Sequence, residues 1–118
     1  MFSLDDFFKA CCKNNLVVVK LINETSDFDV NASDEDGWTA LHYVMSVGAF
    51  EVLKYLVQEY GADMDAKDNE GLTPKQISYV KAVQLGVTEP WDSNPPVEEQ
   101  EMPHIFDKIN RKLSKYQE

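Results

Sequence analysis

Residues 34 to 42 read Asp-Glu-Asp-Gly-Trp-Thr-Ala-Leu-His, and a related phrase, Asp-Asn-Glu-Gly-Leu-Thr-Pro, returns at residues 68 to 74. Gly37 and Gly71 hold the same place in the two phrases. Glycine suits a tight turn that needs a positive φ, and the threonine that follows can cap a helix. Pro74 suits a first helical position, where its missing N–H has no partner to lose. The two phrases therefore predict two equivalent turns, each leading into a helix.

The spacing between these phrases extends into the flanking segments. Residues 10–22 align with residues 44–56, and residues 29–32 align with residues 63–66, with most apolar positions in common. A period of about 33 residues, combined with a turn of the Thr-Pro-Leu-His type, is the signature of one repeat family. The chain resembles the ankyrin repeat over about residues 7–80.

The resemblance implies an all-α fold, an ankyrin-repeat solenoid of helix-turn-helix units with projecting β-turn or hairpin loops. We expect repeats at about 1–33, 34–67 and 68–86, with the first and third degenerate. Apolar residues at helical spacing predict helices over 4–12, 16–24, 40–47 and 50–59.

The C-terminal third departs from the repeat. Residues 87–102 form a Pro-rich acidic linker, in which the expected second helix of the third repeat does not appear. Residues 103–118 predict an amphipathic basic helix. Two interpretations stay open: the helix caps the open end of the third repeat, with Trp91 filling a gap on the way, or it docks as a tethered helix in a partner's groove.

The resemblance also indicates where partners bind, because the turn tips and the first helix of each pair carry the variable contact positions of the family. Tyr43, Ser46 and Val47 are expected to be exposed on the concave surface. Trp38 either packs partly against the neighbouring turn or serves as an exposed hot spot among carboxylates. His42 matches the family's structural histidine, which bridges adjacent repeats. The candidate partner-contact residues are Glu35, Asp36, Trp38, Tyr43, Val47, Lys67, Asn69, Glu70 and Leu72.

The charge of the chain is unevenly distributed. The sequence has 11 basic and 21 acidic side chains and a formal net charge of −10, and residues 34–74 alone carry two basic and nine acidic ones. Such a surface attracts basic partners and repels nucleic acid and anionic membranes. We therefore expect a basic protein partner, no direct nucleic-acid contact, no membrane, and a monomer or weak self-association.

Catalytic and metal-binding patterns are missing from the sequence. There is no Gly-rich phosphate loop, nucleophile elbow or metal-binding His/Cys cluster. The acidic turns do not fit a calcium loop, because counting from Asp29 or from Asp65 puts an acidic residue where glycine is required at the sixth position. We expect no catalytic residue, no cofactor and no metal.

The N-terminus is acidic, and no apolar run is long enough to span a bilayer, so we expect the cytoplasm or the nucleus. We interpret the chain as a non-enzymatic protein–protein interaction module acting through acidic turn tips and the concave helical face. An adaptor, a chaperone or escort, and a steric inhibitor all fit this interpretation. The alternatives are a regulatory subunit of an enzyme complex and a self-associating structural module.

Overall fold

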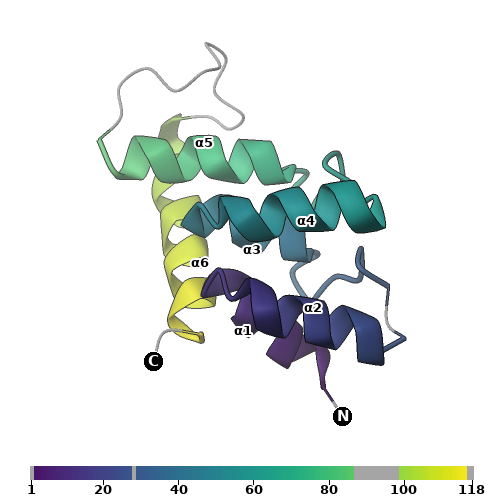
Figure 1. The fold of residues 1–118 in the computed structure, drawn as a ribbon. Helices are drawn as coiled ribbons and strands as arrows, with labels where there is room; N and C mark the ends of the chain where they lie inside the picture. The colour runs from purple at the N-terminus through teal and green to yellow at the C-terminus, as the bar shows by residue number, and fades with distance from the viewer. Residues whose placement is uncertain (1, 28, 87–98, 117–118) are drawn as a thin grey trace.

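The computed structural model describes residues 2–27, 29–86 and 99–116 (Figure 1). In these ranges the chain forms six α-helices and one short 3-10 helix, without any strand, so the all-α repeat fold is confirmed. Each of the four helices predicted from apolar spacing begins at the predicted residue and ends within one residue of the predicted end. The elements are α1 (Leu4–Cys12), α2 (Leu16–Thr25), α3 (Ala40–Val47), α4 (Phe50–Tyr60), α5 (Pro74–Gln84), η1 (Glu99–Glu101) and α6 (Met102–Ser114).

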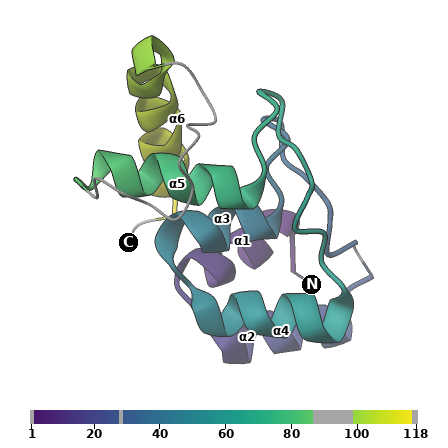
Figure 2. The same ribbon diagram turned by 90° about the horizontal axis from the view of Figure 1, so that it is seen from above.

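The helices lie in two rows. The inner row places α3 between α1 and α5, and the outer row places α2 beside α4 (Figure 2). Two loops, residues 29–39 and 61–73, project from the inner row as stacked hairpins. Each repeat buries its apolar face against its neighbours, as a solenoid requires. Large side chains from all three repeats, including Phe7, Leu41 and Ile77, are buried in one core.

The hairpins are built in the same way, each closed by its first aspartate. Oδ1 of Asp34 accepts the backbone N–H groups of Asp36 and Trp38 at 2.9 and 3.0 Å. Oδ1 of Asp68 likewise accepts two backbone N–H groups, from the residues two and four positions later, at 2.8 and 2.9 Å. Gly37 and Gly71 both have φ of +80°. The two predicted turns are therefore equivalent in hydrogen bonding as well as in sequence.

The hairpins also bond to each other. The backbone N–H of Asn69 donates to the carbonyl of Asp36 at 3.0 Å, and its side-chain amide donates to the carbonyl of Glu35 at 2.9 Å. This stacking brings Asn69 so close to Gly37 that a Cβ on the glycine would lie 2.7 Å from the Asn69 Oδ1 atom. Gly37 is thus required both by its positive φ and by the neighbouring repeat.

His42 joins the second repeat to the third. Its Nδ1 accepts the backbone N–H of Thr39 at 3.1 Å, so Nε2 carries the proton and donates to the carbonyl of Leu72 at 2.8 Å. The side chain is fully buried. In the third repeat Gln76 takes the first of these roles, since its Oε1 accepts the N–H of Thr73 at 2.9 Å. The predicted structural role of His42 agrees with these bonds.

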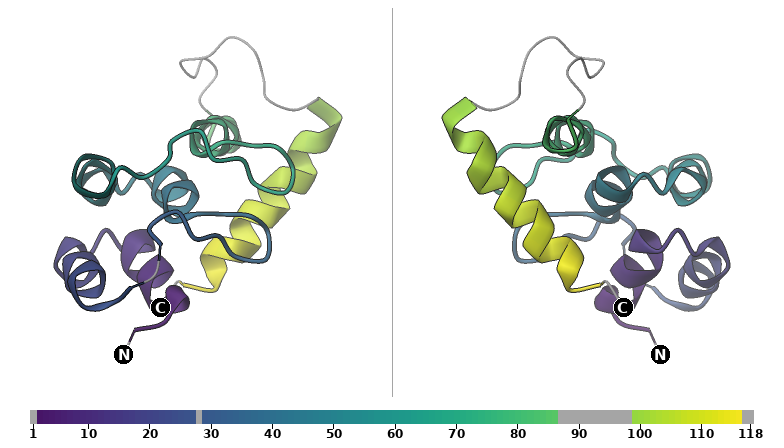
Figure 3. Two further views of the ribbon diagram at one scale, coloured as in Figure 1. Left: turned by 90° about the vertical axis from the view of Figure 1, so that its right-hand side faces the viewer. Right: turned by 90° about the vertical axis from the view of Figure 1, so that its left-hand side faces the viewer.

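The C-terminal helix crosses the stack. α6 packs against α5 of the third repeat, and its role as a cap stays a prediction. It runs from α5 past α3 to α1, along the side from which the hairpins project (Figure 3). The predicted linker lies mostly at residues 87–98, outside the described ranges, and so does Trp91.

Substituting the two turn glycines should separate backbone strain from contact between repeats. Gly71→Ala adds a Cβ with no atom within 4 Å, so only the positive φ opposes it, at about 1 kcal/mol. Gly37→Ala has the same φ and also meets Asn69, so we expect a loss of about 2 kcal/mol or more. Urea unfolding measures both values. Equal losses would show that the hairpins do not depend on this close approach.

The stability of the protein should fall as the pH drops below neutrality because of His42. Burial lowers the pKa of His42 below its ordinary 6.5, against the opposing effects of the Leu72 carbonyl and the Asp68 and Asp34 carboxylates. The unfolded chain therefore binds a proton in a range where the folded chain does not, and stability declines from pH 6.5 downwards.

The measurement is the free energy of unfolding in urea at pH 7.5 and pH 5.5, for wild type, His42→Gln and His104→Gln. His42→Gln should lose this part of the pH dependence. His104→Gln is the control, because it removes a histidine whose side chain is 66% exposed and lies outside the core, with Nε2 3.3 Å from Oε2 of Glu70. The assignment fails if the two variants keep the same pH dependence.

Candidate functional site

One face of α6 is buried against the repeats. Its apolar contacts come from a stripe at helical spacing, as the sequence predicted, and a turn of the helix separates most of them. Phe106, which belongs to the predicted stripe, is only partly buried. The buried apolar residues of this segment are Met102, Ile105, Ile109, Leu113 and Tyr116.

Lys112 of α6 is held by the second repeat. Its Nζ lies 2.6 Å from Oδ2 of Asp34 and 2.7 Å from Oδ2 of Asp36. The residue is only 9% exposed, which is unusual for a lysine. Its ammonium also lies 5.1 Å from the centre of the Trp38 ring and 5.5 Å from that of Tyr43. Two carboxylates and two aromatic rings thus replace the water that this charge loses.

Lys108 makes the equivalent contact with the third repeat. Its Nζ lies 2.6 Å from Oε1 of Glu70 and 3.4 Å from Oδ2 of Asp68, and the residue is 6% exposed. Burial opposes its charge, yet the hydrogen bond to Glu70 and the two carboxylate charges raise the pKa of Lys108 above its ordinary 10.5. The lysine is therefore charged at neutral pH.

The first repeat receives the end of the helix. The Tyr116 hydroxyl donates to Oδ1 of Asp5 at 2.9 Å, and Nζ of Lys115 lies 3.2 Å from the same atom. The hydrogen bonds from Tyr116 and Lys115 lower the pKa of Asp5 below its ordinary 3.8. Residues 108, 112 and 116 thus meet the third, second and first repeats at intervals of four.

We call the carboxylates that face α6 the acidic row. The row runs along the stack, and its two central pairs come from the two equivalent hairpins. Side chains four residues apart lie on the same face of a helix, about 6 Å apart along its axis, so a single helix can reach successive repeats. The acidic row consists of Asp5, Asp34, Asp36, Asp68 and Glu70.

Aromatic side chains pack against one another beside the acidic row. The Tyr43 ring centre lies 5.0 Å from that of Trp38, 5.6 Å from that of Tyr116 and 4.7 Å from that of Phe8. The Trp38 Nε1–H donates to Oδ2 of Asp68 at 3.0 Å, and the Tyr43 hydroxyl donates to Oδ2 of Asp34. Apolar packing and carboxylate bonding therefore use the same side chains.

Three of the nine predicted contact residues are buried. Trp38 is 0% exposed, and Tyr43 and Leu72 are each 2% exposed. The expectation that Tyr43 and Ser46 lie open on the concave surface is wrong for this conformation. Tyr43 is covered by Tyr116, while Ser46 turns its hydroxyl onto the Tyr43 carbonyl at 2.7 Å. Trp38 is not an exposed hot spot here, because Lys112 lies over its ring.

The other six predicted residues are at least partly open. Asp36 and Glu70 have side chains that are 42% and 30% exposed while pairing with α6. Val47, at the end of α3, is 39% exposed. The remaining three occupy the hairpins and are exposed: Glu35, Lys67 and Asn69. The structure brings Asp36 and Glu70 together with Trp38 and Tyr43 along α6, and the role of all nine in partner binding stays a prediction.

The sequence did not single out Lys108, Lys112 and Tyr116 as ligands of the turns. The sequence does contain a signal for them. These three residues are four positions apart and so lie on one helical face, and each of the two repeat phrases carries its own carboxylates for such a face to meet. That signal becomes specific only once the helix is known to cross the hairpins. Its direction across the stack decides which lysine meets which repeat.

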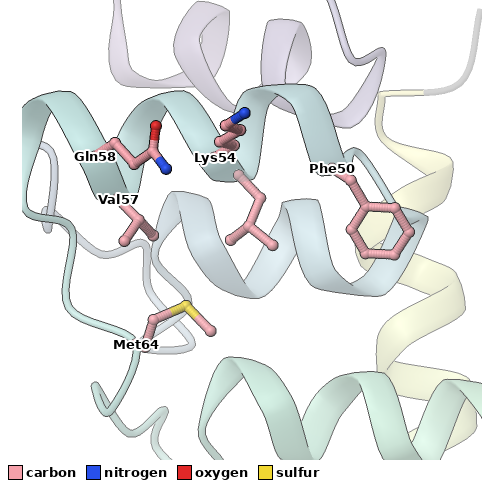
Figure 4. A pocket seen from close by; sticks show the side chains of 6 residues that line it. Phe50, Lys54, Val57, Gln58 and Met64 are labelled. Carbon is pink, nitrogen blue, oxygen red and sulfur yellow. The ribbon is translucent and has the colours of Figure 1, made fainter.

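A second feature lies on the outer row. A pocket of about 280 Å³ opens on α4 (Figure 4). Among the described residues α5 has no outer helix beside it, so this side of α4 stays partly uncovered. The pocket is lined by Phe50, Leu53, Lys54, Val57, Gln58 and Met64.

Two other kinds of feature are absent from the ranges that the structure describes. No three histidine, cysteine, aspartate or glutamate side chains there are arranged to hold a metal ion. No helix in the same ranges is both long and apolar enough to cross a membrane.

Known proteins share this architecture. A family model described as ankyrin repeats matches residues 7–79 in three copies. Human protein phosphatase 1 regulatory subunit 27 is 35% identical over 80 residues, covering 65% of this chain and 51% of that protein. The probable 26S proteasome regulatory subunit p28 of Saccharomyces cerevisiae is 28% identical over 75 residues, covering 64% of this chain and 33% of that protein. The chain thus spans about half or less of the length of these relatives.

A solved structure agrees in shape. A chain in the crystal structure of the yeast ribosomal protein Rps3 in complex with its chaperone Yar1 matches with a TM-score of 0.61 and 24% identity, covering 74% of this chain and 69% of that one. At this identity the similarity supports the fold alone. The family model, however, covers more than half of the chain and coincides with the stacked hairpins and helix pairs. This protein therefore belongs to the ankyrin-repeat family.

Proposed function

We propose that this protein is a non-enzymatic protein–protein interaction module that binds a basic partner through its acidic turn tips and concave helical face. Ankyrin repeats are protein-interaction modules, and this chain has three copies of the repeat. The observation that carries the proposal is the pairing of Lys108 and Lys112 with two carboxylates each. It supports the idea that the hairpins are a binding surface for cations.

The hairpins are well suited to this task. Burying an ammonium is costly unless fixed groups replace its water. Asp34 and Asp68 are fixed, because Oδ1 of each already accepts two backbone N–H groups of its own turn. We call the surface formed by the acidic row and the rings of Trp38 and Tyr43, on which α6 lies, the groove. The remaining oxygen of Asp34 and of Asp68 faces this groove without needing to reorganise. A partner bound in this way should associate faster at low salt and more weakly at high salt.

The proposal covers an adaptor, a chaperone or escort for a basic protein, and a steric inhibitor. The second candidate function is a regulatory subunit of an enzyme complex, favoured by the names of a phosphatase regulatory subunit and a probable proteasome regulatory subunit among the relatives. We place both activities in the cytoplasm or the nucleus.

A charge reversal at the hairpin tip should weaken partner binding. Glu35 is exposed at the tip of the first hairpin and only its backbone carbonyl is bonded to Asn69, so Glu35→Lys should leave the fold intact. Reversing one charge at the rim of an interface should lower the recovery of a basic partner on the order of tenfold at low salt. The matched control is Glu59→Lys, the same change at an exposed position on α4.

The measurement is quantitative mass spectrometry of proteins captured from a lysate of the source organism by the tagged wild type, Glu35→Lys and Glu59→Lys, each washed at two salt concentrations. A basic protein that Glu35→Lys and high salt both release, while Glu59→Lys retains it, would support the proposal. A regulatory role would appear as capture of an enzyme whose activity the protein changes. Identical recovery with both variants at low salt would reject the acidic hairpins as the binding surface.

A further inference from the structure

We infer that α6 occupies the partner-binding groove as an internal ligand, and that the partner's binding element is a basic amphipathic helix that takes its place. This inference rests on the proposed function and specifies the partner. The required element carries lysine or arginine four residues apart, each followed by an apolar residue, as in Lys108-Ile109 and Lys112-Leu113 of α6.

The first argument is that α6 and the expected partner use the same residues. Four of the nine predicted contact residues touch α6 in this structure. Asp36 and Glu70 form ion pairs with its lysines, and the rings of Trp38 and Tyr43 lie beneath Lys112. While α6 is in place, a partner cannot reach the buried rings of Trp38 and Tyr43 or the carboxylate oxygens of Asp36 and Glu70 that pair with its lysines.

The second argument is the register between α6 and the repeats. Each hairpin contributes one carboxylate pair to the centre of the acidic row, and the two pairs are a full repeat apart in the sequence. The two lysines of α6 that meet these pairs are only four residues apart. Any helix that crosses the hairpins at the same angle with basic residues four apart can make the same contacts. The groove therefore recognises a pattern, and α6 is one helix that has it.

The third argument is charge. Residues 1–86 carry seven basic and 14 acidic side chains, a net charge of −7, while residues 102–116 carry four basic and one acidic, a net charge of +3. The attraction that holds α6 is thus available to any basic helix. Because Lys108 and Lys112 lose most of their hydration on burial, much of their Coulomb energy offsets that loss. A competing helix with the same pattern therefore needs only the same net gain, which is the attraction of its cations to the carboxylates minus the hydration that they lose.

The pocket on α4 gives weaker support for a partner-binding site. The pocket on α4 is apolar and open, but the described residues do not show what covers it. Its lining also includes neither a member of the acidic row nor a predicted contact residue.

The test uses the full chain and a fluorescent peptide with the sequence of residues 99–116, added in trans. Lys108→Gln with Lys112→Gln weakens the internal competitor but leaves the acidic row unchanged. We expect this double variant to bind the peptide at least about tenfold more tightly than wild type, because α6 no longer reduces the fraction of open groove. The control, Lys54→Gln with Lys75→Gln, removes the same charge at exposed positions on α4 and α5 and should bind like wild type.

The peptide itself supplies a second control. A version with glutamine in place of both of its central lysines should bind at least about tenfold more weakly to every form of the protein. The inference would be overturned if the wild type and the variant with Lys108→Gln and Lys112→Gln bound the unmodified peptide with equal affinity. Equal affinity for the two peptides would overturn it as well.

Amide hydrogen exchange on the wild-type protein gives a test that does not depend on whether a variant folds. Adding the peptide in excess should increase exchange in α6 and leave the amides of α1 to α5 protected. Absence of binding up to millimolar peptide, or binding with unchanged exchange in α6, would overturn the displacement. In either case a basic partner lost specifically from Glu35→Lys would leave the proposed function intact, so the two failures can be told apart.

Discussion

The structure depends on the first aspartate of each repeat phrase, which bonds in two directions. Oδ1 of Asp34 and of Asp68 accepts two backbone N–H groups and so closes the hairpin. Oδ2 of each faces inwards, where it meets a lysine of α6 and an aromatic hydrogen-bond donor, the Tyr43 hydroxyl or the Trp38 indole. The residue that shapes the turn therefore also fixes the negative charge of the groove.

This double role explains how the remaining residues divide their functions. Asp36 and Glu70, two positions after each first aspartate, add the second carboxylate to each lysine and stay partly exposed. Burial tends to raise the pKa of Asp34, but Lys112, Tyr43 and the Trp38 backbone together lower it below its ordinary 3.8. Asp34 is thus charged at neutral pH, and the rigid members of the row set the geometry that its exposed members complete.

The repeat made much of the fold predictable and left the site largely hidden. Helix limits followed from apolar spacing, and the turns followed from Gly37 and Gly71, because both signals are local. The exposure predicted for Tyr43 was wrong because its cover comes from Tyr116, which lies far away in the sequence, just beyond the last helix. The basic stripe of the last helix was recognised, but neither its path across the hairpins nor its partners can be read from local spacing. The burial and the contacts of these residues depend on tertiary packing, which local sequence spacing does not reveal.

The charge of the groove affects how α6 can be replaced by a partner helix. Without α6 the acidic row would lose the cations that now lie between its members, in a part of the molecule whose net charge is already −7. Repulsion among carboxylates that the backbone holds in place cannot be relieved by moving them apart, so an empty groove is unfavourable. Replacing one basic helix by another avoids that state, since the carboxylates stay paired in both complexes. The same fixed charges that bury two lysines of α6 thus favour exchange of helices over simple opening.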